Sequence, residues 1–444
     1  MASWFEWLFG EEVKKPVAAP PIVDPRRISM VKAHTIVGSI ETSTYAANYN
    51  GLVKWLTDNE FKVADRLMKD DAILSHHHIA LRPACRGGCF AHGPGCFGTK
   101  APNEAVYLLG DTHGDFESMV AVLDTIIDTA KVYGNNEPTV YLLGDVLDRN
   151  GETCMYEAVF IMAIMQKALP EQFAKYNSIK LGIVKGDHDI ALKWDMSKKF
   201  SASVKPADFC DWLNARMEAH KVKGAYVEEY SYVGRAWIRL MQECPSAAFL
   251  DESGTLLSHG GIPRSDIQAM MNKGIPYLMQ SQGAATDFEW CRMVDAKNKL
   301  LNRGSKTSEI GFGEFASFNA LMGGKIKRFV FGHQHPAKGF MRLDKCYPGY
   351  DVFCISSFRK DDTIGGPTVP YYCKISVDRA DVYCLQPAKY VVKLEETSAD
   401  KPAAAKADPP IVTTPMQSYP TLSPAPIWQC KTKTTTTVPV GGAK

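Results

Sequence analysis

Five short motifs that place Asp or His beside Gly constrain this chain more than any other feature. They are Gly110–Gly114, Gly144–Arg149, Gly186–Asp189, Ser258–Gly261 and Gly332–His335. Most of them follow an apolar run that predicts a buried strand. Glycine lets the backbone bend sharply after such a strand, and functional side chains concentrate on loops that a rigid scaffold positions. The sequence therefore predicts strands whose ends carry a cluster of Asp and His side chains.

Apolar strands alternate with helical stretches between residues 104 and 392. Strands are predicted at Val106–Leu109, Val140–Leu143 and Ile179–Val184, and helices at Phe116–Lys131 and Cys154–Leu169. Such alternation is typical of an α/β fold. Residues 46–74 also have helical spacing of apolar side chains. Late in the chain come three strands without helices between them, as in a mixed sheet: Val352–Ile355, Tyr371–Ile375 and Val382–Leu385.

The bulk composition indicates which kinds of partner and which cellular compartment to expect. The 444 residues include 51 basic and 49 acidic side chains, so the formal net charge is only +2 and no nucleic-acid binding is expected. The 12 cysteines are scattered, often within apolar runs, which favours free thiols in a reducing compartment and predicts a cytoplasmic protein. The sequence lacks a recognisable signal peptide and a long apolar run, so no transmembrane segment is expected.

Changes in composition divide the chain into three parts. Residues 1–45 are predicted to be an N-terminal arm or linker, residues 46–392 a folded domain, and residues 393–444 a Pro- and Thr-rich tail. The tail has too few large apolar side chains to offset its ordering entropy, so we expect it to be disordered. Residues 83–103 form a Cys- and Gly-rich insertion. A zinc site there would use Cys85, Cys89, His92 and Cys96, but the spacing favours a plain loop.

The composition of the motifs points to a particular chemistry. Carboxylates and imidazoles are ligands that hard or borderline cations prefer. Phosphate esters are cleaved slowly because their anionic oxygens repel an attacking hydroxide. Two cations about 4 Å apart activate a water, neutralise the phosphoryl oxygens and assist departure of the leaving group. Five such motifs in one chain therefore indicate a two-metal phosphoesterase.

The motifs resemble those of the phosphoprotein phosphatase (PPP) family within the calcineurin-like metallophosphoesterases. The family patterns are GDxHG, GDxxDRG, GNHE, HGG and a late His after an apolar run. The resemblance covers about residues 46–392, which would be the catalytic domain. It implies a calcineurin-like α/β fold, with a central β-sandwich of mixed sheets flanked by helices and a dimetal site on loops at strand C-termini. A weaker stretch, Asp287–Trp290 followed by Asn302–Gly304, is similar to the segment that carries a second phosphate-binding arginine.

The resemblance implies a set of metal ligands. Two divalent or trivalent ions are expected, with Mn²⁺ favoured in vitro and Fe or Zn as alternatives. Their ligands would be Asp111, His113, Asp145, Asp187, His259 and His333, and Asp145 would bridge the two ions. His335 stays open: in broader metallophosphoesterases the Gly-His-x-His motif gives one ligand to each metal, whereas PPP members usually lack the second His.

The resemblance also implies the catalytic groups. A metal-bridging hydroxide would be the nucleophile, and His188 would be the general acid that protonates the leaving alkoxide. Asp148 would orient the imidazole of His188. Arg149 and Arg303 would hold the phosphate oxygens, because a planar guanidinium matches phosphate geometry.

Several positions depart from the family pattern. Asp187 stands where the family has Asn, which adds negative charge beside an anionic substrate. Asp189 is shorter than the family Glu, and Asn150 replaces the Gly after the arginine of the second motif. Ile355–Phe358 occupies roughly the place of the family's Ser-Ala-Pro-Asn-Tyr loop. Insertions are expected around 134–138 and 197–229.

These observations favour a serine/threonine phosphoprotein phosphatase, a metal-dependent phosphomonoester hydrolase acting on a phosphoprotein or a phosphorylated small molecule. A diadenosine-polyphosphate or nucleotide hydrolase and a phosphotyrosine phosphatase are the enzyme alternatives. The alternative from a different functional class is a scaffold protein with weak catalytic activity. A protein partner would then bind through the aromatic N-terminal segment or the C-terminal tail.

Overall fold

The computed structural model of this chain describes most of the predicted folded domain. The described residues are 31–37, 42–71, 73, 105–250, 253–264, 282–294, 309–337, 339–343, 345–359, 370–377 and 379–386. The Cys- and Gly-rich insertion and the C-terminal tail lie outside these residues, as does the aromatic N-terminal segment.

Among the described residues, the first large sheet carries the first three motifs. Its strand order is β1 (Val31–Val37), β15 (Ala380–Gln386), β14 (Tyr371–Ile375), β2 (Val106–Leu109), β3 (Thr139–Leu142) and β4 (Lys180–Ile183). The strands β2, β3 and β4 are parallel, so their C-terminal ends lie along one edge. β14 runs antiparallel to both β2 and β15, and β1 pairs with β15 in parallel.

The second large sheet of the described chain carries the last two motifs. Its order is β12 (Phe340–Arg342), β13 (Asp351–Ile355), β11 (Arg328–Phe331), β8 (Thr255–Ser258) and β7 (Ala247–Leu250). β8, β11 and β13 are parallel, whereas β7 and β12 close the two edges in antiparallel pairing. The histidine motifs follow β8 and β11 directly, so both leave the same edge of this sheet.

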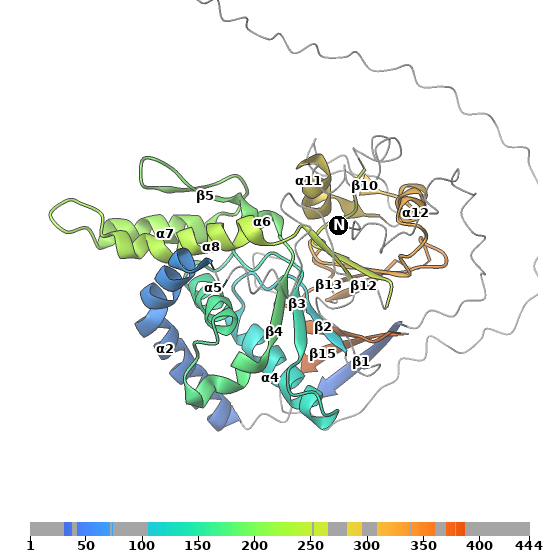
Figure 1. Ribbon diagram of the computed structural model, residues 1–444, viewed down its shortest axis with the longest axis horizontal. Coiled ribbons are helices and arrows are strands. Elements are labelled where there is room, and N and C mark those ends of the chain that lie inside the picture. Colours follow the sequence, from blue (N-terminus) through green and yellow to red (C-terminus); the bar gives the residue numbers. More distant parts are fainter. Residues whose placement is uncertain are drawn as a thin grey trace, which may run out of the picture. The chain divides into compact units, whose positions relative to one another are not determined.

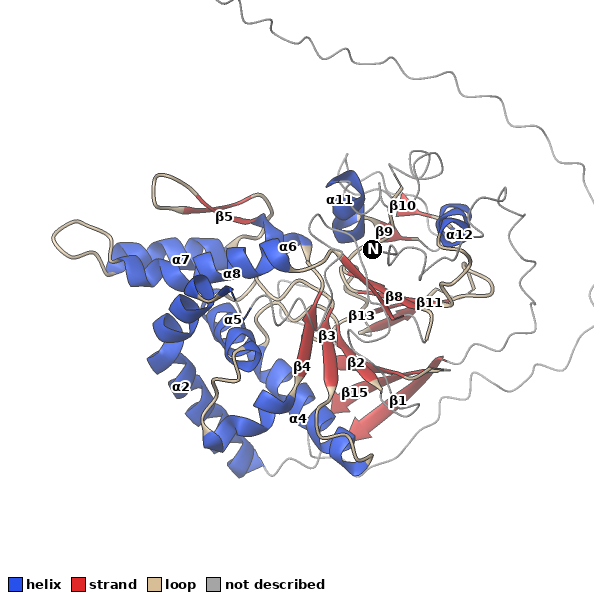
Figure 2. Cartoon of the chain, viewed as in Figure 1, coloured by secondary structure: helices blue, strands red, loops and turns tan. Residues whose placement is uncertain are grey.

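The two sheets pack face to face and enclose an apolar layer. Along β2 the side chains alternate: Val106 and Leu108 lie in the layer between the sheets, whereas Tyr107 and Leu109 lie in the core under the helices. Leu257 of β8 enters the same inner layer from the second sheet. The arrangement is a β-sandwich, visible as two groups of arrows in Figure 2.

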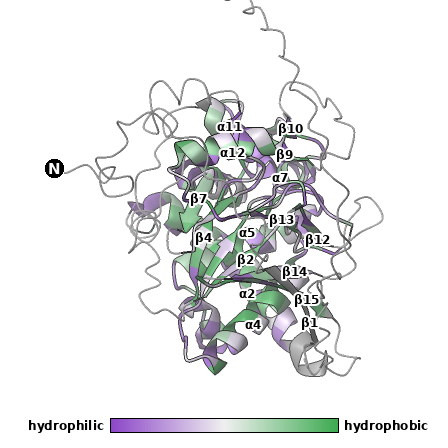
Figure 3. Ribbon diagram, turned by 90° about the vertical axis from the view of Figure 1, so that its right-hand side faces the viewer, coloured by the Kyte–Doolittle hydropathy of each residue, from purple (hydrophilic) through white to green (hydrophobic). Residues whose placement is uncertain are grey.

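Helices cover the outer faces of both sheets (Figure 1). The helices α2 (Thr42–Lys69), α4 (Phe116–Val132), α5 (Gly151–Met165), α7 (Asp208–Ala219) and α8 (Tyr232–Glu243) contribute to the core on the first sheet. The helices α11 (Gln282–Trp290) and α12 (Phe312–Leu321) contribute to the core on the second sheet. Hydrophobic residues are evident along α4 and β4 in Figure 3.

Short elements complete the surroundings of the motifs. The one-and-a-half-turn helix α6 (Asp187–Ala191) leads into a hairpin of β5 (Leu192–Trp194) and β6 (Phe200–Ala202). The remaining short elements are η2 (Glu171–Ser178), η3 (Glu228–Ser231), β9 (Arg292–Met293) and β10 (Glu309–Ile310). The insertion expected around 197–229 thus contains β6 and α7.

The predicted fold class, an α/β sandwich of mixed sheets flanked by helices, is confirmed. Several element boundaries differ by a few residues, and two of these differences have a clear meaning. The helix predicted to reach Leu169 ends at Met165. Lys167 adopts a left-handed φ of 50°, and Pro170 disfavours helical backbone at the residue before it. In addition, β1 and the start of α2 lie within the stretch assigned to the N-terminal arm. The division into arm, catalytic domain and tail stays a prediction.

No helix in the described ranges is long and apolar enough to cross a membrane. Several buried cysteines in the described core carry free thiols, as the scattered cysteines of the sequence favoured. They include Cys154, Cys210, Cys244, Cys354 and Cys373.

Candidate metal centre

The predicted ligands come together where the C-terminal ends of the parallel strands of both sheets meet. Asp111 and His113 follow β2, Asp145 follows β3 and Asp187 follows β4. From the second sheet, His259 follows β8, and His333 and His335 follow β11. The two sheets are tied together here, since the backbone N–H of His333 donates to the Asp111 carboxylate at 2.9 Å and 3.0 Å.

A first group consists of Asp111, His113, Asp145 and His335, whose ligand atoms all lie within 4.8 Å of one another. His335 Nε2 lies 2.8 Å from Asp111 Oδ2 and 3.2 Å from His113 Nε2. His113 Nε2 is also 3.6 Å from Asp145 Oδ2. The geometry therefore places His335, which the sequence left open, in the first group.

A second group consists of Asp145, Asp187, His259 and His333, again within 4.8 Å. Asp187 Oδ1 lies 3.0 Å from His259 Nε2 and 3.1 Å from His333 Nδ1. Asp145 Oδ2 lies 3.2 Å from His259 Nε2. Asp145 thus belongs to both groups. Two sets of four oxygen and nitrogen ligands that share one carboxylate fit a pair of neighbouring divalent cations.

The histidines present a defined ring nitrogen to these groups. His113 Nδ1 lies 3.0 Å from the carbonyl oxygen of Leu147, and His259 Nδ1 lies 2.8 Å from that of Leu143. Each contact takes up Nδ1 as a donor and leaves Nε2 as the ligand atom. Such hydrogen bonds fix the tautomer and ring orientation of metal-binding histidines.

Burial and charge give His113 and Asp111 the ionisation states that metal binding requires. Burial lowers the pKa of His113 to about 3, so this imidazole is neutral and keeps a lone pair at neutral pH. Burial by itself would raise the pKa of Asp111, but the hydrogen bond from His335 and the charges of the surrounding imidazoles hold it well below its usual range. Asp111 is therefore anionic, as a carboxylate that binds a metal has to be. At His259 burial by itself would lower the pKa, but the Asp145 charge and the hydrogen bonds to Asp145 and Asp187 raise it well above its usual value, so a cation would displace a proton there.

The site stores backbone strain. Six of its non-glycine residues have left-handed φ angles: His113 (47°), Asp145 (51°), Asp148 (73°), Arg149 (79°), His333 (63°) and His335 (41°). Such conformations cost of order 1–3 kcal/mol each and persist where the surrounding structure imposes them. The same turns approach one another closely, since a Cβ on Gly332 would lie 2.1 Å from Asp111 Oδ1 and one on Gly186 2.1 Å from Asp145 N.

His188 and Asp148 form a buried pair beside the second group. His188 Nδ1 lies 2.8 Å from Asp148 Oδ2, while Asp148 Oδ1 accepts a hydrogen bond from the backbone N–H of Phe209 at 3.1 Å. Burial by itself would lower the pKa of His188, but the Asp145 charge and the hydrogen bond to Asp148 raise it to about 9. Arg149 follows in the same loop and is half-buried. Arg303 lies outside the described residues.

Two buried carboxyl groups support the loops of the site and were not assigned a role from the sequence. Asp189 Oδ1 accepts hydrogen bonds from the N–H groups of Val146 and Leu147, both at 3.1 Å, and its Oδ2 accepts one from Gly186 at 3.1 Å. It thereby joins the loop that carries Asp145 to the loop that carries Asp187. Asp189 is one methylene shorter than the Glu of the family pattern, yet its carboxylate reaches both loops.

The second such group is Glu157, on α5. Its Oε2 accepts hydrogen bonds from Thr112 Oγ1 at 3.0 Å and from the Gly114 N–H at 3.1 Å, the residues that flank His113. Burial raises the pKa of Glu157 well above its ordinary value. The sequence did hold a signal, because Glu157 is the one charged side chain between Cys154 and Met165 in an otherwise largely apolar helix.

An aromatic residue that lay outside the sequence assignments packs on the first group. The ring of Phe358 meets those of His113 and His335 edge-to-face, with centroids 5.4 Å and 5.2 Å apart. Phe358 lies in the segment that stands roughly where the family has its Tyr loop. This position therefore carries a ring without a hydroxyl.

A β-sandwich whose strand ends gather two Asp/His groups around one shared carboxylate defines a metallophosphoesterase, a class of hydrolases. The family model for calcineurin-like phosphoesterases matches residues 104–337. The chain belongs to this family, which confirms the resemblance at that level and the expectation of an enzyme.

Structural comparison finds relatives of low identity. A protein serine/threonine phosphatase from Saccharomyces cerevisiae, described as similar to human phosphatase PP5, is 15% identical with a TM-score of 0.45, over 74% of this chain and 90% of that chain. A cold-active protein-tyrosine phosphatase from a psychrophilic Shewanella species is 16% identical with a TM-score of 0.36, over 64% and 80%. Likeness at this level carries no information on the substrate. A search of curated protein sequences gives no match.

Proposed function

We propose that this protein is a metal-dependent phosphomonoesterase that removes phosphate from phosphoserine or phosphothreonine in proteins. The observation that carries the proposal is the pair of ligand groups joined at Asp145, with the His188–Asp148 pair beside it. The metal groups are common to phosphoesterases of many kinds. The His–Asp pair followed by Arg149 supports the phosphoprotein phosphatase branch, whose motifs the sequence resembles.

Two cations would be held by the side chains that the two groups contain. When bound, they would supply the positive charge that activates a water molecule and neutralises the phosphoryl oxygens. The donor set of carboxylates and imidazoles suits manganese, iron or zinc alike. Three carboxylates, from Asp111, Asp145 and Asp187, would balance part of the added charge.

The chain's own residues would perform the remaining steps. The guanidinium of Arg149 would bind two oxygens of the phosphoryl group and orient it. As a water oxygen adds to phosphorus and the P–O ester bond breaks, His188 would transfer a proton to the departing alkoxide oxygen. Asp148 would hold the imidazole at Nδ1, leaving Nε2 for the transfer, and would stabilise its charged form.

Hydrolysis of p-nitrophenyl phosphate with and without added Mn²⁺ tests the phosphoesterase activity. We expect manganese-dependent turnover that Asp145→Asn abolishes, because that substitution weakens both groups at once. Asp211→Asn is the matched control, since it removes an exposed carboxylate of α7. Turnover that survives Asp145→Asn would contradict the shared-ligand assignment.

A substrate panel then tests the branch. Phosphoserine, phosphothreonine and phosphotyrosine peptides and diadenosine tetraphosphate are compared at equal concentration in manganese. The proposal predicts the highest kcat/KM on the serine or threonine peptides. A preference for the dinucleotide would place the enzyme among nucleotide hydrolases, and one for phosphotyrosine would move it to that class.

A further inference from the structure

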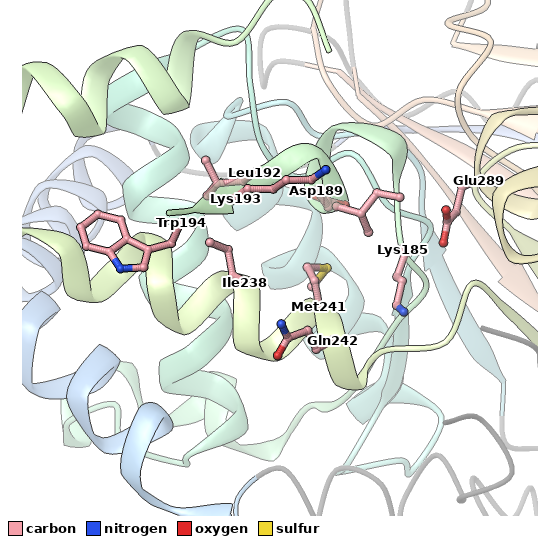
Figure 4. A pocket seen from close by; sticks show the side chains of 10 residues that line it. Lys185, Asp189, Leu192, Lys193, Trp194, Ile238, Met241, Gln242 and Glu289 are labelled. Carbon is pink, nitrogen blue, oxygen red and sulfur yellow. The ribbon is translucent and has the colours of Figure 1, made fainter. Parts of the chain in front are cut away.

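A pocket of about 480 Å³ lies beside the candidate metal centre, between α6, the β5 strand, α8 and the end of α11 (Figure 4). This volume lies in the range of small-molecule sites. The pocket includes Lys185 and Asp189, which flank Asp187 and His188 in sequence. None of the residues assigned to the metal groups or to phosphate binding lines it, so it is distinct from the reaction site.

The two ends of the pocket differ in character. Figure 4 shows Lys185 and Glu289 at one end and Trp194 at the other, with Ile238 and Met241 between them. The indole and the aliphatic side chains offer an apolar wall. The far end offers an ammonium and a carboxyl group. A ligand that fits must therefore have an apolar body and a polar end.

Glu289 is the most informative residue of the polar end. Its side chain is only 2% exposed, and its Oε1 accepts a hydrogen bond from Ser246 Oγ at 2.6 Å. Its Oε2 is buried and has no hydrogen-bond partner. A buried carboxyl oxygen without a partner is costly, so the site favours a ligand that donates a hydrogen bond to it.

Lys185 limits which donor the ligand can carry. Its charge acts on Glu289, yet within the described residues the two side chains form no ion pair. Lys185 and Lys193 both line the pocket and would repel a cationic ligand, whereas an anionic ligand would lie against the carboxyl groups of Asp189 and Glu289. Asp189 is the weaker alternative acceptor, because its oxygens already accept three of the roughly four hydrogen bonds that a carboxylate can take. A neutral group with adjacent N–H and C=O satisfies both Glu289 and Lys185.

We infer that this pocket is a second binding site, for a neutral small molecule with an amide-type end and an aromatic or aliphatic body. The amide N–H donates to Glu289 Oε2 and its carbonyl oxygen accepts from Lys185 Nζ. The body lies along Ile238 and Met241 and reaches Trp194. The site does not depend on the reaction proposed above, since no residue of the metal groups contacts such a ligand.

Three probes of one shape and different charge test the inference: phenylbutanamide, phenylbutanoate and phenylbutylamine. Binding is measured by ligand-observed NMR titration on the full-length chain. We expect saturable binding of the amide, about tenfold tighter than that of either charged analogue, since the amide alone keeps both hydrogen bonds. Absence of saturable binding by the amide overturns the inference.

Variants separate this site from unspecific adsorption. Glu289→Gln keeps the shape but turns the acceptor at Oε2 into a donor beside Lys185, so the preference should move from the amide to the carboxylate. Trp194→Ala should weaken all three probes several-fold. Met196→Ala, a fully exposed apolar residue next to the β5 strand but outside the pocket, should change nothing. An unchanged amide preference in Glu289→Gln would contradict the assignment.

Discussion

Asp148 Oδ2 lies 2.8 Å from Nδ1 of His188, and both side chains are buried. This contact commits one nitrogen of the imidazole to the carboxylate and leaves the other for the proton transfer proposed above. Since His188 belongs to neither ligand group, the proposed proton donor is separate from the proposed metal ligands.

That separation predicts the behaviour of His188→Asn. Turnover of alkyl phosphates should fall by about 10²–10⁴-fold, because the leaving alkoxide loses its proton donor. Turnover of p-nitrophenyl phosphate should fall less, since its leaving group needs no proton. Metal content, measured by elemental analysis, should stay at the wild-type level. Equal losses on both substrates, or loss of metal, would show that His188 acts otherwise.

Arg149 has a left-handed φ of 79° and a buried Nε without a hydrogen-bond partner. Replacement by Gly relieves this strain, so Arg149→Gly should raise the free energy of unfolding by about 1 kcal/mol, after allowance for the larger entropy of Gly in the unfolded chain. The same variant should lose phosphate affinity and hence kcat/KM. Urea denaturation and steady-state kinetics measure the two effects. Arg149→Ala is the control, because it loses the guanidinium and retains the strain.

Asp187 Oδ1 lies within 3.1 Å of two histidine nitrogens of the second group. Asn at this position keeps an oxygen ligand and removes one negative charge, so Asp187→Asn should still bind two metals, with weaker affinity at the second group. Isothermal titration of the metal-free protein, prepared with a chelator, with Mn²⁺ measures the number of sites and their affinities. Complete loss of one metal would show that the carboxylate charge is indispensable.

Glu157 holds the residues on either side of His113 through Thr112 and Gly114. Because burial raises the pKa of Glu157 well above its usual value, the neutral variant Glu157→Gln should be nearly as stable as the wild type. Glu157→Leu leaves both donors unpaired and should cost about 2 kcal/mol of unfolding free energy. It should also weaken metal binding at the first group. Equal stability of the Leu and Gln variants would rule out this supporting role.

Glu289 should make stability depend on pH. Burial raises its pKa from 4.5 to about 7. The hydrogen bond from Ser246 and the charges of Lys185 and His259 offset part of this rise, whereas the charge of Asp187 adds to it. Ionisation is therefore easier in the unfolded chain, and this group's contribution to stability falls as the pH rises from 4.5 to 7. Glu289→Gln removes the effect, so its advantage over the wild type should grow across that window, to roughly 3 kcal/mol. Unfolding titrations at pH 5 and pH 8 measure it.

The sequence predicted the elements that local patterns specify. Apart from His335, each proposed ligand follows an apolar run and sits beside Gly, so strand, turn and side-chain chemistry are all encoded within a few residues. The strands β2 to β4 and the helix α4 were found for this reason. Helix α5 was found too, although its end was misplaced because a left-handed Lys167 and a following Pro170 stop it.

What the sequence did not predict depends on contacts between distant segments. Glu157 acts on a loop 43 residues away, and Ser246 reaches Glu289 across the same separation. His335 could be placed only when β11 was brought against β2. Such partners are chosen by the packing of the two sheets, and no spacing within one segment encodes them.

The ligands of the first group are spread widely along the chain, since His113 and His335 are 222 residues apart. A ribosome adds about 5–20 residues per second, so roughly 10–45 s separate the synthesis of these two ligands. During that time the early Asp and His side chains exist without their late partners. The complete first group therefore exists only after residue 335 has left the ribosome, and a cation that needs all four of its side chains would bind only from that moment.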